Sequence, residues 1–301
     1  MSLQVAPHRG LATTTALVGA VVAAAAGERD VIVLLGDPGE LVPSTDPVVV
    51  VLADDAALVT AGSTIRADHA VATVGYSAGA DTRATDIAVD VEGTGFVALR
   101  HGVALPVRLA LVGERHVPAA LAALEVGLQL GLPPETAVAA LAAVTSAESG
   151  NLETAASAHG RRLIDDGYDL TPLSTTEALK TLAEITRDSA RSIAVLGELD
   201  LPAGTGPQES REEHDRIGRL VVRLNIDALI VIGQSARHIH NAAGLEGSWD
   251  GESVLVDTAE EAYDLLTDQL SERGSDTVVL VKSPFSDRLR ALGATIESVS
   301  A

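Results

Sequence analysis

The sequence predicts an α/β protein of two domains, and three observations on its 301 residues support that fold class. In the C-terminal half, short β-branched runs alternate with amphipathic segments, which is typical of a parallel sheet with helices on both faces. The N-terminal half has less regular β-branched runs and then two Ala/Leu-rich helices. The length suits two domains of about 150 residues each. Because apolar periodicity gives way to small and polar residues near 149–151, we expect domains at 1–150 and 151–301.

The C-terminal domain is expected to be doubly wound. Its expected strands share runs of Val, Ile and Leu and lie at 161–165, 192–197, 228–233, 253–257 and 277–282. Between them, apolar residues recur at helical spacing, as Ile217, Val221 and Leu224 do. Strands that alternate with helices in this way form a parallel sheet.

The N-terminal domain is expected to be a mixed α/β unit closed by a helical pair. Its expected strands lie at 31–35, 48–52, 86–91 and 96–99, and its expected helical pair lies at 118–144. The segment Thr13–Thr15 is expected to cap an Ala-rich helix at its N-terminus.

Charge and composition exclude several classes of function. The chain has 42 Asp and Glu against 21 Lys and Arg, a net charge of −21, so it lacks the basic surface that binds nucleic acid or anionic membranes. It has no cysteine for disulfides or metal sites. The apolar run at 20–26 is too short to cross a bilayer. We expect a cytoplasmic protein with no membrane insertion.

Polar residues follow the expected strands of the C-terminal domain, where open α/β sheets bind ligands. They include Asp165 and Asp166, then Glu198, and finally Lys282. This set could bind a charged small molecule, although polar residues also end strands for structural reasons alone. The histidines are scattered and predict no metal site; His214, within ESREEHDRIG, is expected on an exposed helix.

A phosphate-binding loop would require a lysine near the N-terminus, and none is present. Gly10 precedes a run of threonines, as in a P-loop, but the lysine position is occupied by Leu11 or Ala12. The only lysines of the chain are Lys180 and Lys282, so no other lysine is available nearby.

Several collinear segments resemble the Mur ligases, in particular the members that add D-alanyl-D-alanine to a UDP-linked muramoyl tripeptide. The similar segments run from about Gly39 to Lys282 and include LVGERHVPAALAALEVGLQLGLPPETAVAALAAV, LIDDGYDLTPLSTTEALKTLA, IAVLGEL, SREEHDRIGRL and VVLVK. The family has a UDP-sugar domain, a central ATPase and a Rossmann-like C-terminal domain. The resemblance implies a shortened central domain at 1–150, a Rossmann-like domain at 151–301, and no first domain in this sequence.

The chain departs from the family at positions that carry its chemistry. The resemblance places Ala12 (or Leu11) at the P-loop lysine and Pro38 at the carbamylated metal-site lysine. In the family's D-D-S-Y-N-A-N-P motif, the two aspartates and the tyrosine are kept. The degenerate positions are Ala12, Pro38, Arg115 (for His), Ala119 (for Asn), Asn151 (for Arg), Asp169 and Thr171 (for Asn), and Phe285 (for Arg).

These departures favour a non-catalytic Mur ligase homologue that acts as a binding, scaffold or regulatory protein in cell-wall synthesis. It would use no ATP, Mg²⁺ or other metal, have no catalytic residue, and act through a protein partner or self-association. An active ATP- and Mg²⁺-dependent ligase completed by a partner chain is the alternative, and a sensor of wall peptides is a third hypothesis. The residues that could still line a ligand site are Asp165, Asp166, Tyr168, Glu198, His214 and Lys282.

Overall fold

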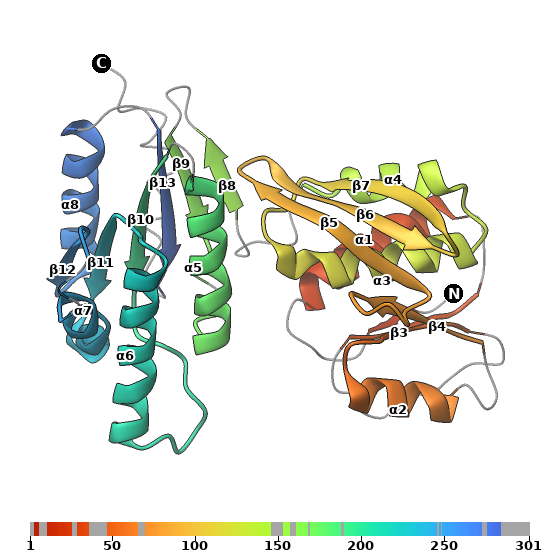
Figure 1. The fold of residues 1–301 in the computed structure, drawn as a ribbon, viewed down its shortest axis with the longest axis horizontal. Coiled ribbons are helices and arrows are strands. Elements are labelled where there is room, and N and C mark those ends of the chain that lie inside the picture. Colours follow the sequence, from red (N-terminus) through yellow and green to blue (C-terminus); the bar gives the residue numbers. More distant parts are fainter. Residues whose placement is uncertain are drawn as a thin grey trace. The chain divides into compact units, whose positions relative to one another are not determined.

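The computed structural model confirms the α/β fold class (Figure 1). It describes residues 3–5, 11–25, 29–35, 47–65, 70–145, 153–156, 161–167, 169–187, 190–245, 247, 249–272 and 276–283. The chain divides into two compact units, Met1–Glu148 (unit 1) and Ser149–Ala301 (unit 2). None of the helices in these described ranges combines the length and the apolar character that a bilayer-spanning helix needs.

Unit 1 is built on a seven-stranded sheet whose spatial order follows the chain. Its strands are β1 (Leu3–Val5), β2 (Val31–Leu34), β3 (Val48–Leu52), β4 (Val71–Gly75), β5 (Thr82–Asp90), β6 (Gly93–Arg100) and β7 (Val103–Leu109). Neighbours from β1 to β5 are parallel, whereas β5, β6 and β7 form antiparallel hairpins.

Helices cover both faces of the parallel part of this sheet. Helices α1 (Leu11–Ala24), α3 (Val117–Gln129) and α4 (Pro134–Ala142) pack together on one face, and α2 (Ala56–Ile65) packs on the other. Consecutive strand residues therefore enter different cores, as Val31 and Ile32 do, which explains the continuous β-branched runs. The helical pair predicted at 118–144 is confirmed as α3 and α4.

The prediction that Thr13–Thr15 caps α1 is wrong, because α1 already begins at Leu11. Thr14 is fully buried, three and four residues before the buried Leu17 and Val18. The apolar face of α1 thus extends one turn further toward the N-terminus than the sequence pattern suggested.

Unit 2 contains a six-stranded sheet in the order β12-β11-β10-β13-β9-β8. Its strands are β8 (Glu153–Ala156), β9 (Arg161–Asp165), β10 (Arg191–Leu196), β11 (Ala228–Ile232), β12 (Glu252–Val256) and β13 (Thr277–Lys282). All are parallel except β8, which pairs antiparallel with β9 at one edge. Strand β13, the last in the described part of the chain, lies in the middle of the sheet between β10 and β9.

The helices of unit 2 confirm the doubly wound prediction. Helix α8 (Ala259–Glu272) packs on one face through Ala262, Leu266 and Leu270. Helices α5 (Pro172–Thr186), α6 (Pro207–Arg223) and α7 (Arg237–Gly244) pack side by side on the other face. A Cβ on Gly218 would lie 2.2 Å from the Ile239 carbonyl oxygen, so glycine is what allows α6 and α7 to approach so closely.

Candidate functional site

The residues predicted at strand ends gather where β9, β13 and β10 finish. The Asp166 N–H donates to the Val281 carbonyl (2.9 Å), and the Gly197 N–H donates to the Lys282 carbonyl (2.9 Å). Asp165 is buried, and its Oδ1 accepts the Gly167 N–H (3.2 Å). Three strand ends are thereby tied together around β13, at the edge where α/β sheets bind ligands.

Lys282 is the centre of this cluster, and its ammonium group points into the protein. Its Nζ lies 2.8 Å from Asp166 Oδ2, and both side chains are 0% exposed. The same Nζ donates to the carbonyl oxygens of Asp166 and Asp169 and to Ser174 Oγ. These contacts satisfy the ammonium within the protein, so Lys282 holds the β9–α5 loop in place and is not presented to a ligand.

Two of the degenerate positions have local structural roles at the start of α5. Thr171 is the N-cap, and its Oγ1 accepts the Ser174 N–H (3.4 Å) just before Pro172 at the first helical position. Asp169 Oδ1 accepts the Thr171 N–H (2.9 Å). Both side chains therefore stabilise the turn into α5. Tyr168 lies outside the described residues.

The prediction that His214 is exposed is wrong, because its side chain is buried inside unit 2. Its Nε2 accepts the Leu199 N–H (3.2 Å), so Nδ1 carries the proton and donates it to the Ser210 carbonyl (2.7 Å). His214 thus fixes the loop after β10 against α6. Glu198, one residue before Leu199, is exposed and forms no ion pair or hydrogen bond with any described residue.

In unit 1, two of the degenerate positions, Arg115 and Ala119, lie at the start of α3. Arg115 donates from Nε to His116 Nε2 (3.4 Å) within a short 3₁₀ turn, Glu114–His116. Ala119 is buried in the first turns of α3. Ala12 belongs to the first turn of α1, and nothing about its side chain is described. The positions Pro38, Asn151 and Phe285 lie outside the described residues.

His116 is held neutral, which the sequence did not predict. It is 3% exposed, and burial, together with the charge of Arg115, lowers its pKa from 6.5 to about 3, although a hydrogen bond with the Val112 backbone opposes this shift.

The depressed pKa of His116 predicts acid-sensitive stability. Its neutral form stabilises the fold fully above pH 6.5, and that contribution is lost as the pH falls toward about 3, because the unfolded chain binds the proton first. Between neutral pH and about pH 5 the expected loss is about 2 kcal/mol. His116→Gln should remove this component of the pH dependence in urea unfolding followed by circular dichroism. His101→Gln, at an exposed turn, serves as the control. If the free energy of unfolding of His116→Gln falls with pH as steeply as that of the wild type, the prediction is wrong.

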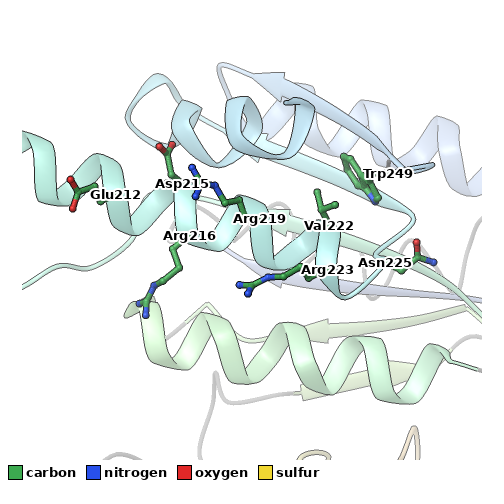
Figure 2. Close-up of a pocket in the computed structure, with 8 residues that line it drawn as sticks. All are labelled: Glu212, Asp215, Arg216, Arg219, Val222, Arg223, Asn225 and Trp249. Atoms are coloured by element: carbon green, nitrogen blue, oxygen red, sulfur yellow. The ribbon is translucent and has the colours of Figure 1, made fainter. Parts of the chain in front are cut away.

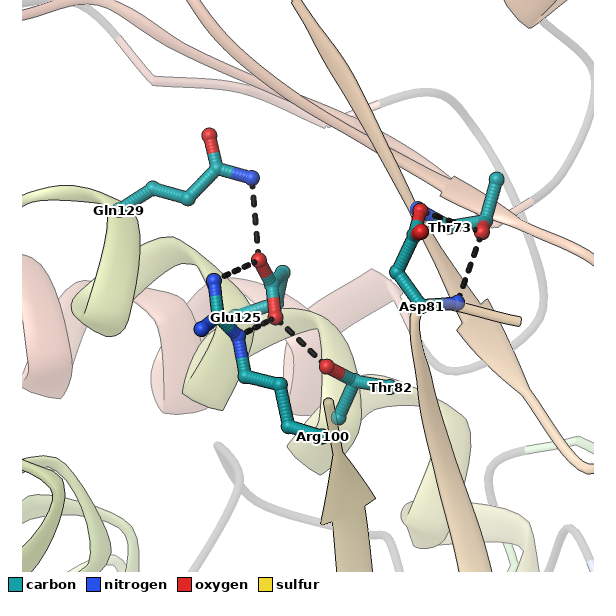
Figure 3. A network of polar contacts seen from close by, with 6 residues as sticks. All are labelled: Thr73, Asp81, Thr82, Arg100, Glu125 and Gln129. Atoms are coloured by element: carbon teal, nitrogen blue, oxygen red, sulfur yellow. Dashed lines mark hydrogen bonds and ion pairs between the residues drawn. The ribbon is translucent and has the colours of Figure 1, made fainter. Parts of the chain in front are cut away.

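A buried carboxylate network in unit 1 also escaped the sequence prediction (Figure 3). Glu125 on α3 is 1% exposed and accepts from Arg100 Nε (2.8 Å), Arg100 Nη2 (3.1 Å) and Thr82 Oγ1 (2.7 Å). Gln129 adds a fourth hydrogen bond. Burial would raise the pKa of Glu125, but these hydrogen bonds outweigh it and lower the pKa below its ordinary value. The network fastens the β5–β6 hairpin to α3.

The described residues show no group of three or more His, Asp or Glu side chains placed to hold a metal ion. Most polar groups at the strand ends of unit 2 bond to one another, but Glu198 is exposed and the buried Ser283 Oγ has no hydrogen-bond partner among the described residues. The described polar side chains of this site hold its own loops in place.

Comparison with known proteins identifies the fold and its relatives. Residues 152–285 match the family model described as Mur ligase, glutamate ligase domain. The UDP-N-acetylmuramoyl-tripeptide–D-alanyl-D-alanine ligase of Mycobacterium leprae is 38% identical over 202 residues, covering 63% of this chain and 38% of that protein. The enzyme of the same name from Mycobacterium tuberculosis (strain H37Rv) is 35% identical over 222 residues, covering 68% and 42%. The chain thus spans about two fifths of the length of these curated relatives.

Solved structures agree on the fold. A crystal structure of MurF from Acinetobacter baumannii matches with a TM-score of 0.75 at 19% identity, over 98% of this chain and 76% of that one. MurF from Thermotoga maritima, solved in complex with ADP, matches with a TM-score of 0.70 at 14% identity, over 99% and 79%. The chain is therefore similar to the Mur ligases in sequence and in fold, and its residues 152–285 match the family model of their glutamate ligase domain.

Proposed function

We propose that this chain is a MurF-like protein of peptidoglycan synthesis that does not catalyse ligation and acts by binding a protein partner or another copy of itself. Its relatives are named as ligases that join D-alanyl-D-alanine to UDP-N-acetylmuramoyl-tripeptide. The apolar framework of the fold is kept, whereas the residues that differ from the family motifs lie at positions that the resemblance assigns to phosphate, metal and nucleotide.

The observation that carries this proposal is the absence of lysine from residues 1–179. The family uses one lysine in the P-loop and a second, carbamylated, near the metal; this chain has Ala12 or Leu11 and Pro38 at those positions. Phosphoryl transfer depends almost entirely on placing positive charge around the transferred group. Without these charges we expect the reaction to be lost and not merely slowed.

The structure of unit 2 is consistent with this proposal. Lys282, the one lysine kept from a family motif, is fully engaged by Asp166, Ser174 and backbone carbonyls. Asp169 places a carboxylate where the family has a neutral amide near nucleotide, and negative charge there opposes phosphate binding.

Isothermal titration of the full chain with Mg-ATP tests the proposal. We expect no heat of binding at millimolar nucleotide, with the M. tuberculosis relative titrated in parallel as the positive control. Binding in the micromolar range would overturn the proposal. So would release of phosphate when ATP, UDP-muramoyl tripeptide and D-alanyl-D-alanine are added, whether by the chain alone or only after a second protein is mixed in. The last outcome would favour the alternative of a ligase completed by a partner chain.

A further inference from the structure

Helix α6 carries two arginines that form no ion pair with the described residues around them. Arg219 and Arg223 are exposed, and neither forms an ion pair or hydrogen bond with any residue that the structure describes. By contrast, Arg211 pairs with Asp215 (3.8 Å) and Arg216 pairs with Glu213 on the same helix. In a chain with twice as many carboxylates as basic groups, two neighbouring arginines without a partner are unexpected.

The surface around Arg219 is hollowed on both sides. One open hollow has a volume of about 710 Å³. Figure 2 shows the three arginines on α6 and Trp249 outside that helix. The residues that line the hollow are Glu212, Asp215, Arg216, Arg219, Val222, Arg223, Asn225 and Trp249. A second, of about 600 Å³, is lined by Arg219, His238 and Leu245, whose side chain is 84% exposed. Exposed apolar groups beside arginines are the usual composition of protein-binding surfaces.

Helix α8 carries the opposite arrangement. Asp264 and Asp268 are exposed, and no ion pair or hydrogen bond connects either of them to a described residue. Like Arg219 and Arg223, they are four residues apart on one helix, so the two charges of each pair are separated by about 6 Å along their axis. Like charges at this spacing repel each other and destabilise the helix slightly. Contact between the arginine pair and the aspartate pair would offset the repulsion within each.

The two pairs do not meet within one copy of unit 2. Helix α8 packs on one face of the sheet against Ile193, Val195 and Ile230, whereas α6 packs beside α5 and α7 on the opposite face. We propose that α6 of one copy binds α8 of a second copy, with Arg219 and Arg223 facing Asp264 and Asp268. Because the contact joins two different surfaces, each copy can use both of them at once. The same contact can then repeat from copy to copy, so the association is head-to-tail. This inference is independent of whether the chain binds ATP.

Net charge sets the conditions for this contact. Two copies of charge −21 repel each other at long range, but salt at about 0.15 M screens charges beyond about 8 Å, while ion pairs in contact are screened less. We therefore expect association to be observable at physiological ionic strength. It should be weak, because exposed ion pairs contribute little individually.

Sedimentation equilibrium of the full chain, from micromolar to millimolar concentration, tests the proposal. The weight-average mass of the wild type should rise with concentration. The variants Arg219→Glu/Arg223→Glu and Asp264→Arg/Asp268→Arg should each lower the association constant about tenfold or more. Lys180→Glu/Arg187→Glu, which changes the net charge as much as Arg219→Glu/Arg223→Glu but at two other exposed positions, should associate like the wild type.

Mixing the two charge-reversed variants provides the decisive result. In the mixture each reversed helix meets an oppositely charged helix again, so association should return to about the wild-type level. Circular dichroism of each variant checks that the fold is kept. A wild type that stays monomeric throughout, or a mixture that does not associate, would overturn the proposal.

Discussion

Replacing Lys282 with methionine should lower the free energy of unfolding of unit 2 by about 3–5 kcal/mol, because it leaves the Asp166 carboxylate buried without its counter-ion. Both side chains are 0% exposed, and their charged atoms lie 2.8 Å apart. Urea unfolding followed by tryptophan fluorescence measures this loss directly, since Trp249 is the only tryptophan of the chain and lies in unit 2.

The chain supplies its own control for this experiment. Lys180, its only other lysine, is exposed on α5, and Lys180→Met should change the stability by about 0.5 kcal/mol or less. The double variant Lys282→Met/Asp166→Leu removes both charges and should recover much of the lost stability. Equal losses from the two single variants, or a double variant less stable than Lys282→Met, would show that the ion pair does not hold the site together.

Replacing Arg100 with methionine should destabilise the β5–β6 hairpin and α3 by about 3 kcal/mol, because Glu125 then keeps only Thr82 and Gln129 as hydrogen-bond donors. The pKa of Glu125 should also rise, since burial favours the neutral acid once the guanidinium is gone. In the wild type the network stabilises unit 1 above the ordinary carboxyl pKa, and this contribution is lost as the pH falls through the lowered pKa. Hydrogen exchange of peptides from 82–100 and 117–129 measures the change locally.

Arg108→Met is the matched control for this second variant. Arg108 pairs with Asp90 in the neighbouring β-hairpin, but both side chains are about half exposed, so the pair should contribute at most about 1 kcal/mol. Faster hydrogen exchange in Arg100→Met alone would support the prediction that the buried Glu125 network stabilises this part of unit 1. Equal exchange in the two variants would mean that burial does not strengthen the Glu125 pair.

The sequence predicted the elements of the fold better than their pairing. The five parallel strands and the two principal helices of unit 2 were visible as local periodicity, because each buries its own apolar face. Strands β1, β4, β7 and β8 were not predicted, and a run such as Leu3–Val5 is too short to show a period. The central place of β13 and the antiparallel edge at β8 depend on contacts between distant segments, which local patterns do not contain.

The sequence predicted which residues meet at the strand ends of unit 2, but not how they bond to one another there. Asp165, Asp166 and Lys282 do meet at the strand ends, as sheet geometry requires. The pattern could not show that Lys282 binds Asp166 across 116 residues of chain. His214 could have been predicted correctly, since Ile217, Gly218 and Val221 place it on the buried stripe of α6. The sequence also contained a signal that Glu125 is buried and paired, because it is the only carboxylate in the apolar helix α3.

The position of β13 determines when unit 2 can finish folding. During synthesis, β9 emerges first, but its parallel neighbour β13 comes more than a hundred residues later. At a synthesis rate of roughly 5–20 residues per second, β13 follows after on the order of ten seconds. Until then, β9 and β10 have unpaired edges on either side of the place that β13 will take. Unpaired edges of this kind recruit other strands. A nascent chain stalled before residue 277 should therefore be held by chaperones or aggregate, whereas six further residues complete both halves of the sheet at once.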